Sequence, residues 1–163
     1  MKIRSSFYGV LILVASLVGC ATMPELSSMQ RRQMQSRSFD DANYDSVFRA
    51  FKTILQDDGY VIKNQDLQGG LIVATIEKST PGSVFMASMN EQKNYQTSEG
   101  YEVSINLEKM GEKTVESRLT IQKLEAFSQG GHSGREILDA ELYQTFYDKV
   151  RVEVERRKAQ GKG

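Results

Sequence analysis

Apolar residues recur at the spacing of an α-helix in two separate parts of the chain. The first set lies on one stripe of a helix of about four turns: Tyr44, Val47, Phe48, Phe51, Ile54 and Leu55. The second set follows near the end: Leu142, Tyr143, Phe146, Tyr147, Val150 and Val154. Because an α-helix repeats every 3.6 residues, each set occupies one face, and two amphipathic helices are predicted. Asp40, Asp41 and Asn43 offer caps for the first helix, and Gly59 is suited to end it. Asp139 offers a cap for the second helix.

Other segments alternate between apolar and polar residues at every second position, which is typical of half-buried β-strands. The clearest is YEVSINL, and the turn that follows it predicts a hairpin with one solvated face. The segment LIVATI is apolar on both faces, which indicates a strand in the middle of a sheet. The predicted strands are residues 36–40, 60–64, 71–76, 101–107 and 114–124.

These elements follow one another in the order β-α-β-β-β-β-α. The economical packing of such an order is an α+β fold. It has a single small domain, with an antiparallel sheet of about four to five strands and two helices on one face. We expect the domain to span residues 36–158 and residues 159–163 to form a flexible tail. A chain of this length commonly folds around one core.

The first residues predict a leader rather than a membrane-spanning helix. Lys2 and Arg4 provide positive charge, and the apolar run from Phe7 to Val18 is about 12 residues long. A helix needs roughly 20 apolar residues to cross a bilayer, whereas a short apolar run behind positive charges is typical of a signal peptide. Residues 1–19 are therefore predicted to be a signal peptide.

The apolar run ends in Leu17-Val18-Gly19-Cys20, which resembles the lipobox of bacterial lipoproteins. The resemblance implies cleavage just before Cys20 and lipidation of this cysteine, so that residues 20–35 form a lipidated tether. In that family an aspartate after the cysteine tends to retain the protein in the inner membrane. Ala21 stands at this position, which implies the outer membrane, with the domain facing the periplasm. The alternatives are an uncleaved anchor and an ordinary secretory leader with a chance cysteine.

The body of the chain resembles a family of small uncharacterised bacterial lipoproteins. The resemblance lies in YDSVFRAFKTILQDDGYVIKNQDLQGGLIVAT, residues 44–75, and in ELYQTFYDKV, residues 141–150. More distantly, the order of elements is similar to the helix-grip modules of the lipoprotein C subunit of the β-barrel assembly machine. The present chain has one such domain where that subunit has two. Neither resemblance implies a reaction.

Composition and motif spacing argue against several classes of function. After removal of the predicted leader, 19 basic residues stand against 21 acidic ones, so the chain lacks the basic excess that nucleic-acid partners favour. Cys20 is the only cysteine, which excludes an internal disulfide. His132, the only histidine, lies in a Gly-rich segment that matches neither a nucleophile elbow nor a phosphate loop, and it lacks companions for a metal site. We therefore expect no enzymatic activity, no metal and no cofactor, and interpret His132 as an exposed residue of a flexible loop.

Residues 79–99 form the longest stretch without a predicted element. Loops of about 20 residues are unusual in compact domains and are often functional, and this one carries Phe85, Met86 and Met89 among polar residues. Exposed Phe and Met side chains suit an adaptable contact with a partner or a membrane surface. The alternatives are a short helix packed on the domain, or disorder.

These patterns predict a membrane-anchored cell-envelope lipoprotein that acts as a binding or accessory module in the periplasm. Its expected partners are the membrane, through the lipid on Cys20, and another envelope protein. The alternative is a carrier of a small apolar ligand, held in a pocket between the sheet and the C-terminal helix.

Overall fold

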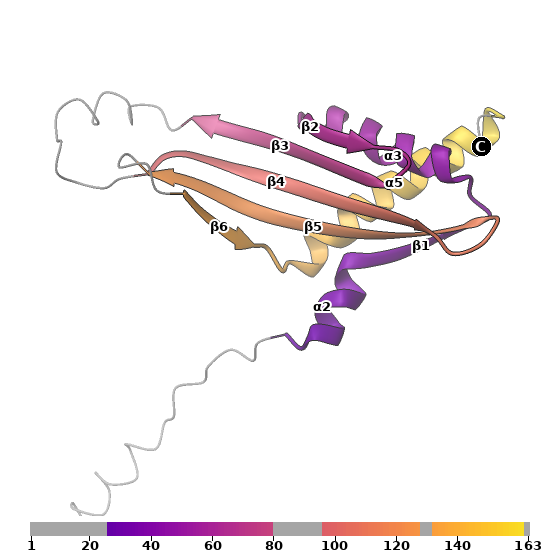
Figure 1. The fold of residues 1–163 in the computed structure, drawn as a ribbon, viewed down its shortest axis with the longest axis horizontal. Helices are drawn as coiled ribbons and strands as arrows, with labels where there is room; N and C mark the ends of the chain where they lie inside the picture. The colour runs from indigo at the N-terminus through magenta and orange to yellow at the C-terminus, as the bar shows by residue number, and fades with distance from the viewer. Residues whose placement is uncertain (1–25, 80–95, 128–131, 162–163) are drawn as a thin grey trace, which may run out of the picture.

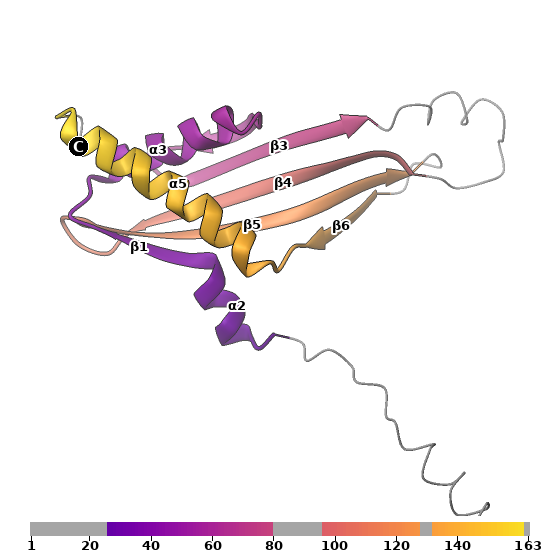
Figure 2. The same ribbon diagram turned by 180° about the vertical axis from the view of Figure 1, so that it is seen from behind.

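The computed structural model describes residues 26–79, 96–127 and 132–161 (Figure 1). All the described strands belong to one antiparallel sheet, and two helices pack across one face of it (Figure 2). This confirms the prediction of a small α+β domain. The elements in chain order are α2 (Ser28–Gln35), β1 (Ser36–Asp40), α3 (Tyr44–Asp57), β2 (Val61–Asp66), β3 (Leu71–Ser79), β4 (Gln96–Lys109), β5 (Thr114–Phe127), β6 (His132–Glu136) and α5 (Ala140–Ala159).

The sheet is built around the long β4–β5 hairpin. Its strand order is β1-β5-β4-β3-β2, and every neighbouring pair is antiparallel. The sixth described strand, β6, pairs with residues 122–126 of β5, whereas β1 pairs with residues 114–118. The short strands β1 and β6, which are far apart in sequence, therefore lie along the same edge of β5 (Figure 1). Strand β2 forms the other edge of the sheet.

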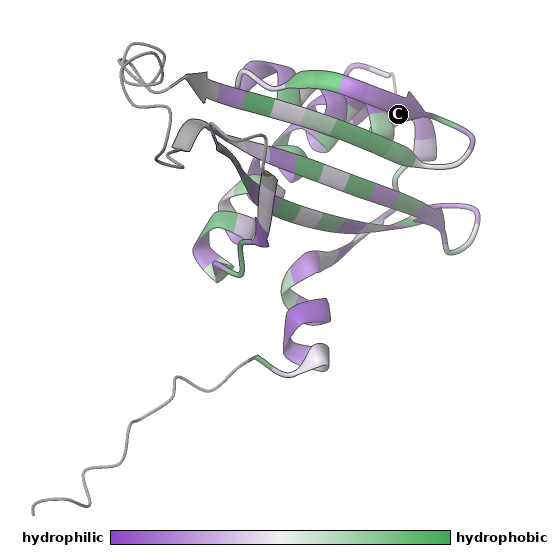
Figure 3. Cartoon of the chain, turned by 60° about the vertical axis from the view of Figure 1, so that its left-hand side comes forward, coloured by the Kyte–Doolittle hydropathy of each residue, from purple (hydrophilic) through white to green (hydrophobic). Residues whose placement is uncertain are grey.

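The core lies between the apolar face of the sheet and the helices α3 and α5. Apolar and polar residues alternate along the central strands (Figure 3), so one face is buried and the other is left to solvent. The Phe51 ring lies at the centre of an aromatic cluster, with ring centroids 5.7 Å from Phe39 and 6.2 Å from both Phe146 and Tyr147. The predicted helical stripes therefore do face the core, although Leu142 at the start of α5 is exposed.

Both long helices begin at residues that the sequence offered as caps. The Asn43 side-chain oxygen accepts a hydrogen bond from the main-chain N–H of Asp45 at 2.9 Å, and the Asp139 carboxylate accepts one from that of Glu141 at 3.0 Å. Each contact satisfies an N–H group that has no partner inside its helix. At the other end of α3, Gly59 has a φ of +86°, which suits a glycine that ends a helix.

Strands β3 and β4 run further than the alternation predicted. The prediction ended one strand at residue 76 and began the next at residue 101, whereas β3 reaches Ser79 and β4 starts at Gln96. The ladder continues through Lys78 opposite Glu99, because main-chain hydrogen bonds form whatever the polarity of the side chains. Both ends of the connection predicted over residues 79–99 are therefore strand residues, and residues 80–95 lie outside the described residues.

The predicted tether also differs from the structure, because residues 28–35 form helix α2. Ser27 caps this helix: its hydroxyl accepts from the N–H of Gln30 at 3.3 Å, and the Gln30 side chain accepts from the N–H of Ser27 at 2.9 Å. The helix lacks an apolar stripe, so hydrophobic periodicity gave no signal for it. The folded domain consequently starts near Ser27 rather than at residue 36, and the described residues hold three helices rather than two.

The segment predicted as a flexible loop around His132 contains strand β6. Its five residues, HSGRE, show no apolar alternation. They pair with β5 from His132 opposite Ala126 to Glu136 opposite Gln122. Ile137 extends this register, since its N–H donates to the carbonyl oxygen of Ile121 at 2.8 Å. Among the described residues, no helix combines the length and the apolar character that crossing a membrane requires.

Candidate functional site

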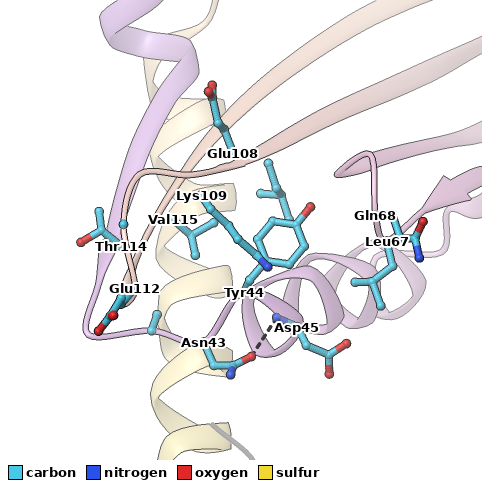
Figure 4. A pocket seen from close by; sticks show the side chains of 13 residues that line it. Asn43, Tyr44, Asp45, Leu67, Gln68, Glu108, Lys109, Glu112, Thr114 and Val115 are labelled. Atoms are coloured by element: carbon cyan, nitrogen blue, oxygen red, sulfur yellow. Dashed lines mark hydrogen bonds between the residues drawn. The ribbon is translucent and has the colours of Figure 1, made fainter.

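An open groove of about 780 Å³ lies at the end of the domain where β4 turns into β5 (Figure 4). Three segments that are distant in sequence form its walls. They are the entry to α3 at residues 42–45, the β2–β3 turn at Leu67 and Gln68, and the hairpin residues around Lys109 and Glu112. The groove is therefore a product of the fold rather than of one continuous motif.

Two main-chain contacts hold the walls in place. The N–H of Ala42 donates to the carbonyl oxygen of Lys113 at 3.0 Å, which fixes the entry to α3 against the hairpin. The N–H of Leu107 donates to the carbonyl oxygen of Gly70 at 2.9 Å, which fixes the β2–β3 turn against β4. Gly70 has a φ of +72°, and a Cβ at this position would overlap the Leu107 carbonyl oxygen. Only glycine fits this turn without distortion.

The groove combines apolar surface with charge. The Lys109 ammonium lies 4.7 Å from the centroid of the Tyr44 ring, a cation–π contact (Figure 4). Partial burial, with a smaller contribution from the charge of Asp66, raises the pKa of the Tyr44 phenol. Leu67 in the lining is 40% exposed, and Met110 at the hairpin tip is 56% exposed. Exposed apolar side chains with charged neighbours are typical of surfaces that contact other proteins.

A second polar cluster joins α2 to the rest of the domain. The Glu136 carboxylate accepts from the Gln35 amide at 2.6 Å and from the Arg31 guanidinium at 3.3 Å. The Tyr147 hydroxyl donates to the main-chain carbonyl oxygen of Gln35 at 2.6 Å. Burial raises the pKa of Tyr147 to about 12. The Gln35 side chain and the Tyr147 ring are buried, so this cluster holds the fold together and offers little surface to a ligand.

The interface between the sheet and α5 is filled by side chains. Tyr143, Tyr147 and Val150 are each at most 1% exposed, and they pack against the strands. Four cavities of 350–780 Å³ formed by described residues lie elsewhere. Three are near the turns and α3, and one of about 410 Å³ lies across neighbouring residues of β3, β4, β5 and β6. Among the described residues, no group of three or more His, Cys, Asp or Glu side chains could hold a metal ion.

Most of the predicted site residues lie outside the part of the chain that the structure describes. Cys20 and the predicted contact residues Phe85, Met86 and Met89 lie outside the described ranges. His132 is the first residue of β6, where it pairs with Ala126.

Sequence reasoning missed the groove because its walls are three turns, each of which looks ordinary alone. The available signal was Leu67, a large apolar residue of the lining that lies within a turn sequence. No protein-family model matches the chain, and no curated protein shows significant sequence similarity to it.

Proposed function

We propose that this protein is a lipid-anchored lipoprotein of the cell envelope that binds another envelope protein. The observation that carries the proposal is Leu17-Val18-Gly19-Cys20, placed directly at the end of a short apolar run behind Lys2 and Arg4. Lipidation at Cys20 attaches the domain to a membrane, and Ala21 favours the outer membrane, with the domain in the periplasm. The resemblances noted above agree with this role.

Two features favour binding over carriage of a small apolar ligand. The sheet–α5 interface, where the carrier hypothesis needs a pocket, is filled by Tyr143, Tyr147 and Val150. The open groove between the hairpin and α3 instead presents Leu67 beside charged residues. A partly apolar, partly charged groove on a surface suits a segment of another protein better than an enclosed lipid.

The anchor is tested by metabolic labelling with a palmitate analogue. The wild-type chain is expected to incorporate the label and to sediment with membranes. Cys20→Ser is expected to lose the label and to accumulate as soluble or unprocessed protein. A wild-type chain without label contradicts the anchor.

The binding surface is tested with a photo-crosslinking amino acid at Leu67, in cells that express the full chain. Val61 is the matched control, because it is an exposed apolar residue of the adjoining strand that does not line the groove. A discrete crosslinked product from position 67 alone supports partner binding in the groove. Equal crosslinking from both positions, or none from position 67, contradicts it.

A further inference from the structure

The helix α2 brings the folded domain much closer to Cys20 than a tether ending at residue 35 does. Seven residues, 21–27, separate Cys20 from the first residue of α2. Fully extended, such a connection spans at most about 28 Å, and as a flexible coil about 15 Å. A tether that ran to residue 35 could reach ~50 Å. A lipid on Cys20 therefore confines α2 to the immediate neighbourhood of the bilayer.

Helix α2 cannot turn freely on the domain. Its last residue, Gln35, is buried, and β1 begins at the next residue without a linker. Glu136 of β6 accepts from Arg31 and Gln35, and Tyr147 of α5 donates to the Gln35 carbonyl oxygen. These contacts come from two other elements, so the orientation of α2 fixes the orientation of the sheet.

The side of α2 that faces solvent carries residues suited to a lipid surface. Met29 is 71% exposed, and Arg32 and Gln33 follow it at positions i+3 and i+4, on the same face of the helix. Leu26, just before the cap, is also exposed. The stretch from residue 26 to residue 38 contains three arginines and no acidic residue. Basic residues beside exposed apolar side chains favour contact with anionic head groups.

Arg32 is the arginine of this stretch that remains available to such a surface. Arg31 pairs with Glu136 at 3.3 Å, and Arg37 donates to the carbonyl oxygens of Gln33 and Ser36 at 2.7 Å. Among the described residues, Arg32 has neither an ion pair nor a side-chain hydrogen bond, and it is exposed. Its charge is therefore not neutralised within the domain.

We propose that Leu26, Met29, Arg32 and Gln33 form a membrane-contact surface that rests on anionic lipid head groups and sets the orientation of the domain. This inference rests on the proposed function, because the lipid on Cys20 supplies the proximity. The α2 side of the domain carries β1 and β6, and β2 forms the opposite edge of the sheet (Figure 1). Contact through α2 thus directs β2 away from the bilayer.

The test uses the full acylated chain in vesicles of phosphatidylcholine and phosphatidylglycerol at a ratio of 3:1. A thioether occupies the Cys20 sulfur in the acylated chain, so Met29→Cys provides a single free thiol for an environment-sensitive fluorophore. Val61→Cys on β2, also exposed, is the matched control. We expect a spin-labelled lipid to quench the fluorophore at position 29 at least twofold more strongly than that at position 61.

Charge reversal tests the role of the arginine. Arg32→Glu is expected to reduce quenching at position 29 to the level at position 61. Lys63→Glu, the same charge reversal at an exposed position of β2, is expected to leave the quenching at position 29 unchanged. Equal quenching at positions 29 and 61, or an Arg32→Glu chain that behaves like the wild type, overturns the membrane-contact surface while leaving the anchor intact. The acyl mass on Cys20, measured on the same sample, reports on the anchor, and its absence removes both proposals.

Discussion

The Tyr147 hydroxyl donates a 2.6 Å hydrogen bond to the main-chain carbonyl oxygen of Gln35, although 112 positions separate the two residues. Ser117 donates to the same hydroxyl at 3.4 Å, so the phenol links α5, the sheet and the end of α2. Tyr147→Phe removes this link and leaves a buried carbonyl oxygen without its donor. We expect a loss of roughly 1–3 kcal/mol of stability, measured by urea unfolding. We also expect faster hydrogen exchange in α2.

The same substitution has a pH signature. Burial raises the pKa of Tyr147 from 10.0 to about 12, so the unfolded chain loses this proton at a lower pH than the folded chain does. The contribution of Tyr147 to stability is fully present below pH 10 and is lost as the pH rises towards 12. The difference in stability between wild type and Tyr147→Phe should shrink over this window. A difference that stays constant contradicts the assignment of the raised pKa to this residue.

Glu153 is predicted to stabilise the domain through its ion pairs. This carboxylate is nearly buried and lies 2.6 Å from Arg156 and 2.7 Å from Arg157, and Arg157 also donates to Thr53 of α3 at 3.0 Å. Glu153→Gln is expected to cost roughly 1.5–3 kcal/mol at pH 7. The control is Glu155→Gln, an exposed pair with Lys158, which should change stability by less than about 0.5 kcal/mol.

Acid is expected to abolish much of the stabilisation that the ion pairs of Glu153 provide. Hydrogen bonding to Arg156 is the largest cause that lowers the pKa of Glu153 below its ordinary value of 4.5. A carboxyl with a lowered folded-state pKa stabilises the fold above its unfolded-state pKa, and this contribution is lost as the pH falls through the folded-state value. The difference in stability between wild type and Glu153→Gln is therefore expected to become smaller as the pH is lowered beneath 4.5. Urea titrations from pH 7 downward measure it.

Gly70→Ala should disturb the groove and the fold together. The added methyl group meets the Leu107 carbonyl oxygen, and the residue is held at a φ of +72°. We expect a loss of roughly 2 kcal/mol or more. The matched control is Gly134→Ala on β6, where a Cβ makes only ordinary contacts from 3.5 Å outward. Equal melting temperatures for the two variants would show that the turn can shift freely.

Phe51→Ala and Phe146→Ala test the packing of the two long helices. Phe51 is fully buried, and its ring lies 6.2 Å from that of Phe146. Each truncation is expected to cost ~3–5 kcal/mol, measured by chemical denaturation. Val152→Ala, on the exposed side of α5, serves as the control and should change stability by less than about 0.5 kcal/mol. A loss under ~1 kcal/mol at both aromatic positions contradicts the packing of these rings in the core.

Elements with local, periodic signals could be predicted from the sequence. The stripes around Phe51 and Phe146 repeat at helical spacing, and Asn43 and Asp139 act as caps within three residues of themselves. Helix α2 has a local cap in Ser27 and Gln30 but no periodic apolar stripe. Its buried residue is the polar Gln35, held by partners more than 80 positions away. Hydrophobic periodicity cannot report a helix that docks through hydrogen bonds.

Tertiary pairing accounts for the other differences. β6 forms because β5 offers it an unoccupied length of edge beyond β1, and nothing within HSGRE indicates this. The groove likewise depends on Gly70 meeting Leu107 and on Ala42 meeting Lys113. Gly70 reaches Leu107 only through the pairing of β3 with β4, and Ala42 reaches Lys113 only through the pairing of β1 with β5. No local segment therefore contains the signal for the groove.

The pairing of β1 with the start of β5 bears on the order in which the chain can fold. Ser36 lies opposite Arg118, so the first strand of the sheet has no edge to join until more than two thirds of the chain has been made. The β4–β5 hairpin joins strands that are neighbours in sequence, so it can form before β1 is added to the sheet. Helix α2 is continuous with β1, and its Gln35 is hydrogen-bonded by residues of β5, β6 and α5. The helix can therefore dock only after α5 has been synthesised. The segment that is synthesised first among the described residues is thus among the last to be secured.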